Sequence, residues 1–285
     1  MWSKSPDRVR FGPAGFPVGA PSRRDAISYL RKLGLGAMEY QAVRAVPKKL
    51  DPLKKFGEEA RKKDIILSLH APYAINLSSP EENKREASIQ RLVAASRAAA
   101  AMGAFHVTFH PGFYSGQAPE DALRLAIESL KEVREILDDE GLEVELGPET
   151  TGKPSQLGSL EEVLAMARAV PGVRPTVDFA HIHAREGGSI AGRLDYARII
   201  DKIEEALGTA DGLVIHFTEV ELTKSGVGEK RHHELGSGYG PPFRPLAEEM
   251  AARGVRWLVI SESPILEEDS LKMKEEYLRV LEGSR

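Results

Sequence analysis

Histidine and carboxylate side chains end a series of short apolar runs in this 285-residue sequence. Six residues hold such a position: His70, His110, Glu149, Asp178, His216 and Glu262. His181 follows three residues after Asp178, and His232 and His233 lie in the glycine-containing loop "KRHHELGSG". The sequence contains no cysteine, and imidazole and carboxylate ligands without thiolates suit zinc, manganese or iron.

These residues are more numerous than one ion requires. An ion that keeps an open catalytic position takes three or four protein ligands. Five histidines and three carboxylates therefore predict two or three ions, with at least one carboxylate shared between two of them. Multi-metal sites of this kind stabilise both the attacking and the leaving oxygen of phosphoryl transfer. The predicted chemistry is hydrolysis of a phosphodiester.

Each of these residues also has an ordinary structural interpretation. A histidine at a strand end often serves only as a hydrogen-bonding residue, and an aspartate there can cap the following helix. The metal interpretation is favoured because seven of the eight histidines, with the carboxylates, are predicted to converge on one face. The exception, His106, is expected to pack within a strand, and His183 is expected to support a ligand rather than bind metal.

Eight strand-like runs alternate with amphipathic segments and must position these residues. The runs cover residues 10–15, 36–43, 65–71, 105–111, 143–149, 174–180, 212–220 and 255–263. Because the alternation has no break in composition, we predict an α/β fold with one (β/α)8 TIM barrel over residues 1–285. Residues at the C-terminal ends of barrel strands lie on the active face. A doubly wound open sheet is the alternative, but "FGPAGFP" does not match its glycine fingerprint.

The helical segments contain recognisable start, stop and packing patterns. From Asp121, apolar residues at steps of three and four predict one buried stripe: Leu123, Ala126, Ile127, Leu130, Val133 and Ile136. Ser22 and Ser159 are predicted N-caps, and Glu162 completes a capping box with Ser159. Four glycines are predicted to end helices: Gly34, Gly103, Gly141 and Gly254. The last segment, 271–283, is expected to close the barrel.

Composition limits the class of protein further. Hydrophobic residues make up 41% and charged residues 29%, which is typical of a globular protein with a sizeable core. No apolar run is long enough to cross a membrane, and the N-terminus lacks a signal-peptide core, so we expect a cytoplasmic protein, associated with the nucleoid if it binds DNA. The net charge of −4 argues against a nucleic-acid coat protein. Asparagine and glutamine are scarce beside lysine, arginine and glutamate, as in proteins from hot environments.

Several motifs, in order along the chain, resemble those of the endonuclease IV family. They are "HAPYAINL", "FHPG", "PET", "VDFAH", "VIHF", "RHHELGSG" and "SES". The resemblance runs from about the second predicted strand to the last helix. Members of this family are zinc-dependent (β/α)8 barrels that cut the DNA backbone 5′ to an abasic site. The resemblance therefore implies a monomeric DNA-repair hydrolase whose partner is double-stranded DNA with abasic lesions.

The resemblance also implies which residues bind zinc. Eight positions match: His70, His110, Glu149, Asp178, His181, His216, His232 and Glu262. His70 and His110 would hold one ion, and Glu149 would bridge it to a second. The second ion would be completed by Asp178, His216 and Glu262. Glu149 would support the hydroxide that attacks phosphorus. His181 and His232 would hold a third ion, which would stabilise the leaving 3′ oxygen.

Six further residues are candidates for contact with DNA: Tyr73, Asn76, Arg44, Lys224, Arg231 and His233. Tyr73 and Asn76 stand at the offsets of the family's first histidine motif, and the family's tyrosine lies near the lesion. Arg44, Lys224 and Arg231 are loop cations of the kind that meet phosphates, and the alternative for each, which the sequence favours, is an ordinary solvated surface charge. DNA binding should therefore be salt-sensitive without strong sequence preference.

One residue departs from the family pattern. The family carries an aspartate two residues before its third-ion histidine, whereas this chain has Lys230 there. A cation about 4 Å from zinc costs several kcal/mol even at an effective dielectric near 20. Three outcomes are open: Glu229 replaces the aspartate, the third site is weak, or the Lys230 ammonium takes over the role of the ion. We expect two firmly held ions and a weakened third.

Two other functions remain open. A sugar isomerase or epimerase of the xylose-isomerase-like superfamily would need one divalent ion, held by four residues: Glu149, Asp178, His216 and Glu262. That reaction does not require the additional histidines on the same face. The other alternative is a non-catalytic protein that binds damaged DNA and uses its metals structurally.

Overall fold

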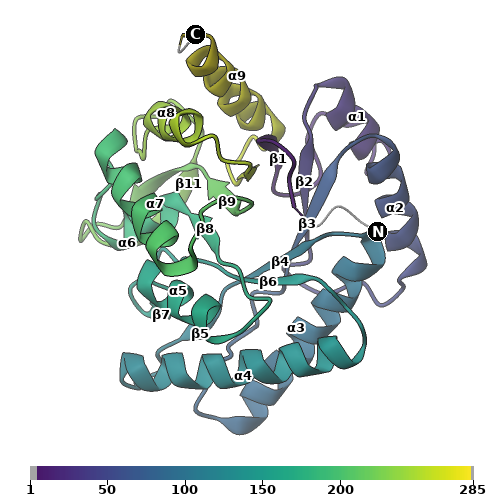
Figure 1. Cartoon of the computed structure of the whole chain (residues 1–285), viewed down its shortest axis with the longest axis vertical. Helices are drawn as coiled ribbons and strands as arrows, with labels where there is room; N and C mark the ends of the chain where they lie inside the picture. The colour runs from purple at the N-terminus through teal and green to yellow at the C-terminus, as the bar shows by residue number, and fades with distance from the viewer. Residues whose placement is uncertain (1–4, 284–285) are drawn as a thin grey trace.

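Eight parallel strands form a barrel at the centre of the computed structural model, which describes residues 5–283 (Figure 1). The barrel strands are β1 (Arg10–Pro13), β2 (Ala37–Gln41), β3 (Ile66–His70), β4 (His106–Phe109), β6 (Glu145–Pro148), β8 (Thr176–Asp178), β9 (Val214–Phe217) and β12 (Leu258–Ser261). Short strands in the loops are β5 (Gly112–Phe113), β7 (Gln156–Leu157), β10 (Glu219–Leu222) and β11 (Glu229–His233). Each of the eight predicted runs therefore contains a barrel strand.

Helices form an outer ring around these strands (Figure 1). They are α1 (Ala26–Lys32), α2 (Asp51–Lys62), α3 (Glu82–Met102), α4 (Pro119–Asp139), α5 (Leu160–Ala169), α6 (Phe179–Arg185), α7 (Arg193–Leu207), α8 (Phe243–Arg253) and α9 (Glu267–Gly283). Among the described residues, no helix is long and apolar enough to span a bilayer.

Two four-stranded sheets make up the barrel wall. One has the order β1-β12-β9-β8 and the other β2-β3-β4-β6. Isolated bridges join them at two seams: Ala14 with Glu39 between β1 and β2, and Leu146 with Val173 and Glu149 with Thr176 between β6 and β8. At the first seam Gly12 is required, because a Cβ there would lie 1.8 Å from the carbonyl oxygen of Ala37. The pairing of β1 with β12 closes the circle between the two ends of the chain.

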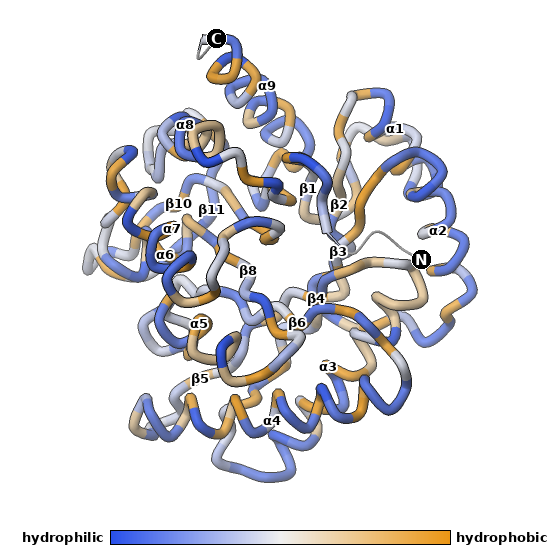
Figure 2. Tube along the Cα trace, viewed as in Figure 1, coloured by the Kyte–Doolittle hydropathy of each residue, from blue (hydrophilic) through white to orange (hydrophobic). Residues whose placement is uncertain are grey.

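The helices follow the predicted patterns in most places. On α4 the apolar stripe faces the core, and the tube alternates between orange and blue along its length (Figure 2). Ser159 and Glu162 form the predicted capping box at the start of α5. The prediction that Ser22 caps a helix was wrong, because α1 begins only after Asp25. The Ser22 hydroxyl instead donates to the Asp25 carboxylate at 2.7 Å.

The seventh predicted run is not one continuous strand. β9 ends at Phe217, and β10 begins at Glu219 and turns away to pair antiparallel with β11. The sequence did not predict this two-stranded ribbon. It matters for function because β11 carries Glu229 and His232.

Candidate metal centre

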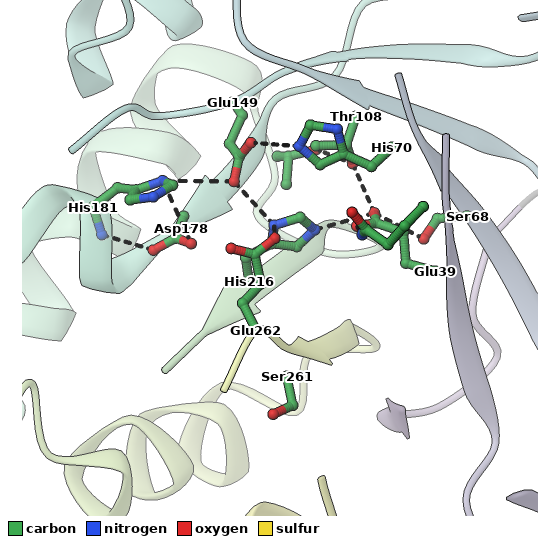
Figure 3. A network of polar contacts seen from close by, with 12 residues as sticks. Glu39, Ser68, His70, Thr108, Glu149, Asp178, His181, His216, Ser261 and Glu262 are labelled. Carbon is green, nitrogen blue, oxygen red and sulfur yellow. Dashed lines mark hydrogen bonds and ion pairs between the residues drawn. The ribbon is translucent and has the colours of Figure 1, made fainter. Parts of the chain in front are cut away.

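The C-terminal ends of the barrel strands bring all eight predicted metal ligands together, and Glu229 joins them. Three groups have ligand atoms within 4.8 Å of one another: His70, His110 and Glu149; Glu149, Asp178, His216 and Glu262; and His181, Glu229 and His232. In Figure 3, Glu149 lies between His70 of the first group and His216 of the second. Imidazole and carboxylate donors in such groups fit zinc, manganese or iron.

Glu149 links the first group to the second. Its Oε2 lies 3.3 Å from His70 Nε2 and 3.0 Å from His110 Nε2. Its Oε1 lies 2.9 Å from His216 Nδ1 on the other side. The side chain is fully buried, and its two oxygens face different groups. This arrangement suits a carboxylate that bridges two cations.

Asp178 caps a helix, which is one of the two roles that the sequence left open, and it is placed for the other, metal binding. Its Oδ1 accepts a hydrogen bond from the backbone N–H of His181 at 2.7 Å and caps α6. Its Oδ2 is buried and has no hydrogen-bond partner. Leaving a buried polar atom unsatisfied costs about 1–3 kcal/mol. A cation bound in the second group would remove that cost, so the residues present fit a metal.

Three histidines are oriented by backbone carbonyl groups. The Nδ1 atoms of His70, His181 and His232 face the carbonyl oxygens of Ala71, Thr150 and Glu262 at 2.8, 2.9 and 3.2 Å. A neutral imidazole has one N–H, and a carbonyl can only accept, so these contacts place the proton on Nδ1 and leave Nε2 free for a metal. His232 Nε2 is buried without a hydrogen-bond partner, as expected of an atom that binds a metal ion.

The third group owes its geometry to a β-bulge in β11. Arg231 pairs with Glu221 and Glu229 pairs with Leu222, so Lys230 is the extra residue. Residues two apart share a face of a regular strand, and one extra residue makes that spacing three. Glu229 is three residues before His232, and its oxygens lie 3.5 Å from the Nε2 atoms of both His232 and His181.

Lys230 does not act in the third group, so the hypothesis that its ammonium replaces the ion was wrong. Its Nζ is bonded to Glu221, and 52% of the side chain is exposed. The bulge directs the lysine outward and Glu229 inward. Of the three outcomes that the sequence left open, the geometry favours substitution by Glu229. How tightly this third group binds an ion stays a prediction.

Gly152, in the loop after β6, is a site residue that the sequence reasoning missed. A Cβ at this position would lie 2.9 Å from Glu229 Cβ and 2.9 Å from His181 Cδ2. Its carbonyl oxygen also accepts the backbone N–H of Glu229 at 3.1 Å. The motif "PETTG", which ends in Gly152, does not indicate this role. The contact is made with Glu229, in a loop more than 70 residues further along the chain.

Charges within the centre shift the pKa values of its residues. Burial lowers the pKa of His181, but nearby carboxylates, Asp178 first, outweigh it and raise that pKa to about 9. Burial raises the pKa of Glu262, but His216 outweighs it and lowers that pKa to about 2. The pKa of Glu149 is also held well below its usual range, because burial is outweighed by neighbouring histidines, His216 first. A bound cation must therefore displace protons from the histidines.

The metal-free protein is expected to lose stability as the solution becomes alkaline. A histidine whose pKa is raised on folding contributes its full stabilisation at pH values below its ordinary pKa of 6.5. For His181 this contribution is lost as the pH rises through its raised pKa of about 9. Glu262 stabilises the fold above its ordinary value of 4.5 and loses its contribution as the pH falls through about 2. Urea denaturation of chelator-treated protein from pH 4 to pH 10 should show this decline between pH 6.5 and 9. Rising stability in that range would contradict it.

The residues predicted to contact DNA lie in several environments. Tyr73 is 53% exposed, and its ring centroid lies 5.3 Å from that of His70 and 5.4 Å from that of His110. Asn76 Oδ1 instead accepts the Ser78 hydroxyl at 3.0 Å and the backbone N–H of Phe113 at 3.2 Å, which orders the loop after β3.

The predicted cations and the remaining histidines also differ in their surroundings. Arg44 and Lys224 are exposed loop residues, whereas Arg231 is bonded to Glu221 and to His233. His233 stacks on Tyr239 with ring centroids 4.0 Å apart. These residues surround the groups without entering them.

Besides His233, two histidines lie outside the three groups. His106 is packed inside the barrel, as predicted, with Nε2 2.8 Å from the Thr176 hydroxyl. His183 does not support a ligand, and that prediction was wrong. Its Nδ1 accepts the backbone N–H of Ile190 at 3.1 Å, so it orders the connection from α6 to α7.

Comparison with known proteins places this geometry in a family. Residues 27–281 match a family model described as "Xylose isomerase-like TIM barrel". The chain belongs to the xylose isomerase-like TIM barrel family. This family member is 35% identical over 270 residues to an uncharacterised protein of Methanocaldococcus jannaschii, with 94% of this chain and 96% of that protein covered.

Other relatives of this family member have names that describe an activity. A protein of Aquifex aeolicus named "Probable endonuclease 4" is 30% identical over 175 residues, which cover 60% of this chain and 61% of that protein. The crystal structure of endonuclease IV from Thermus thermophilus aligns with a TM-score of 0.71 and 22% identity, covering 96% of this chain and 99% of that chain. A D-tagatose 3-epimerase-like protein aligns with a TM-score of 0.69 and 20% identity, covering 93% and 96%. These likenesses in structure show the fold alone, and they confirm the predicted TIM barrel.

Proposed function

We propose that this protein is a metal-dependent phosphodiesterase that cuts the DNA backbone 5′ to abasic sites. The observation that carries the proposal is the set of three donor groups, two of which share Glu149. A reaction that needs one divalent ion would use only one of them. The similarity to "Probable endonuclease 4" proteins supports the same activity. We propose zinc as the ion, and manganese or iron would also suit the donors.

Incision adds water across one phosphorus–oxygen bond, so that the 3′ oxygen leaves with a proton and the phosphate stays on the 5′ side of the abasic residue. Bound divalent ions would supply positive charge to the phosphate and lower the pKa of water. Glu149 would orient the attacking water between the first two groups. His181, Glu229 and His232 would hold charge near the leaving oxygen. Tyr73, exposed above His70, would contact the DNA beside the lesion.

Exposed cations around the active face would bind the DNA backbone. Among the described residues, five cations on the loops after β2 and β6 and in the β10–β11 turn have no ion-pair partner: Arg44, Lys48, Lys49, Lys153 and Lys224. Phosphate contacts of this kind give affinity without reading sequence. We propose that a monomer binds double-stranded DNA through this surface.

A sugar epimerase is the second candidate, because one of the groups could work alone. Glu149, Asp178, His216 and Glu262 would be sufficient to hold a single divalent ion. A nicking assay on a duplex with one abasic analogue, with and without chelator, separates the two functions when it is run beside a panel of ketoses and aldoses. Turnover of a sugar by a protein that is inactive on DNA would overturn the nuclease proposal.

Replacing His70 with alanine should distinguish the candidates further. The substitution removes one of the three donors of the first group and leaves the other two groups intact. We expect incision to fall by about 100-fold or more, whereas an epimerase that uses only the second group should lose much less. The matched control is His183→Asn, which replaces a buried histidine outside the groups. Equal losses in both variants would show that the effect of His70→Ala is on folding.

A further inference from the structure

Glu39, on β2, is a fully buried carboxylate beside His216 of the metal centre (Figure 3). No lysine or arginine pairs with it among the described residues. Four side-chain donors surround it instead: Gln41 Nε2 at 2.8 Å, Ser68 Oγ at 3.1 Å, Thr108 Oγ1 at 3.0 Å and His216 Nε2 at 3.1 Å. Burial of a carboxylate costs free energy, so the presence of Glu39 at this position indicates that it has a function.

His216 differs from the other histidines of the centre in its orientation. His70, His181 and His232 direct Nδ1 to a backbone carbonyl and Nε2 to their donor group. His216 is reversed: its Nδ1 lies 2.9 Å from Glu149 and 3.1 Å from Glu262, and its Nε2 faces Glu39. In Figure 3 the ring lies between Glu149 and Glu39, with a contact to each.

The contacts of Glu39 determine which nitrogen of His216 carries the proton. The Ser68 and Thr108 hydroxyls both donate to Oε2, the oxygen that also faces His216. An ionised carboxylate can only accept hydrogen bonds, so in the contact between Glu39 and His216 the imidazole donates, which places a proton on Nε2. Nδ1 points at Glu149 and Glu262 of the second group, so it is the nitrogen that a cation there would bind once it has displaced the Nδ1 proton. A carboxylate behind a ligand histidine also makes the ligand more basic.

We propose that Glu39 is a positioning residue of the metal centre: it holds His216 with Nδ1 as the metal ligand of the second group. The effect is specific to that group, because the third group has carbonyl acceptors instead. This inference rests on metal binding in the proposed centre and does not depend on whether the substrate is DNA or a sugar.

The test compares Glu39→Gln with wild-type protein by two measurements that do not require activity. Competition with a chromophoric chelator measures the affinity of each zinc ion, and ¹H–¹⁵N NMR of the zinc-loaded protein measures the Nε2–H resonance of His216. Loss of a residue that supports a metal ligand typically lowers metal affinity by about 10–100-fold. We expect a loss of this size for one ion, with the ion of His181, Glu229 and His232 retained. The Nε2–H proton should move upfield when its carboxylate acceptor is removed.

Two further variants keep the proposal testable if Glu39→Gln folds poorly. Thr108→Val removes a donor to the same carboxylate oxygen but leaves Glu39 facing His216, so zinc affinity and the Nε2–H resonance should stay close to wild type. Glu39→Asp keeps a carboxylate one methylene further from the ring and should show a smaller loss than Gln. The proposal is overturned if zinc affinity and the His216 resonance are unchanged in Glu39→Gln, or if Thr108→Val lowers zinc affinity equally. Wild-type protein that binds zinc but does not cut abasic DNA would refute only the proposed function.

Discussion

Replacing Glu149 with glutamine is expected to lower the rate of incision at an abasic site by about 1,000-fold or more. The two oxygens of Glu149 face different donor groups, at 3.0 Å from His110 and 2.9 Å from His216. An amide keeps the shape but offers one oxygen and no charge. One substitution therefore removes a donor from two groups at once.

Single-turnover incision and metal analysis together test this expectation. Glu149→Gln should lose at least one bound ion as well as its activity. The matched control is Glu145→Gln, which changes a glutamate at the start of β6, four residues before Glu149. Glu145 lies outside the groups, with Oε2 3.4 Å from His106 Nδ1. That control should keep its full metal content. Near-normal incision by Glu149→Gln would show that the shared carboxylate is not needed and would refute the assignment of its role.

The second large effect is expected at Glu229. Glu229→Ala leaves only His181 and His232 in the third group, and two ligands are too few to hold a catalytic ion firmly. We expect that ion to be lost and incision to fall by about 100-fold, because charge near the leaving oxygen disappears. Gly152→Ala should weaken the same ion by a different route, since its Cβ would displace Glu229 and His181.

Lys230→Ala is the control for this prediction. Its ammonium is bonded to Glu221 on the outer side of the β10–β11 ribbon, so the variant should keep as many ions as wild type. Native mass spectrometry of the protein with zinc present counts the ions without stripping a weakly held third one. Two ions in wild type and in Glu229→Ala alike would show that the third group does not bind metal. Loss of an ion in Lys230→Ala would show that the bulge does not turn the lysine away.

The sequence was sufficient to predict the barrel and most of the centre. Strand ends are local features, so His70, Asp178 and Glu262 could be placed on one face as soon as the eight runs were recognised. Capping is also local, and the box formed by Ser159 and Glu162 appears as predicted. In both cases the residues that determine the outcome lie within a few positions of one another.

What could not be predicted depends on contacts between distant segments. The orientation of Lys230 depends on a bulge in a ribbon whose partner strand, β10, looked like the continuation of β9. Gly152 was overlooked because its importance comes from Glu229, in a different loop. Glu39 sits within the run "GAMEYQAV", and strand alternation alone does not show that it reaches His216 on the far side of the barrel.

The two seams of the barrel wall have a consequence for the lifetime of the folded state. His216 belongs to the sheet β1-β12-β9-β8, whereas Glu39 and Glu149 come from β2 and from the end of β6 in the other sheet. An ion bound by Glu149, Asp178, His216 and Glu262 would therefore join the two halves across the β6–β8 seam, where the backbone itself contributes only isolated bridges. Opening that seam would require the ion to be released first. Metal exchange and barrel opening would then share one slow step, the release of the ion. The ion would therefore slow unfolding in addition to its part in the reaction.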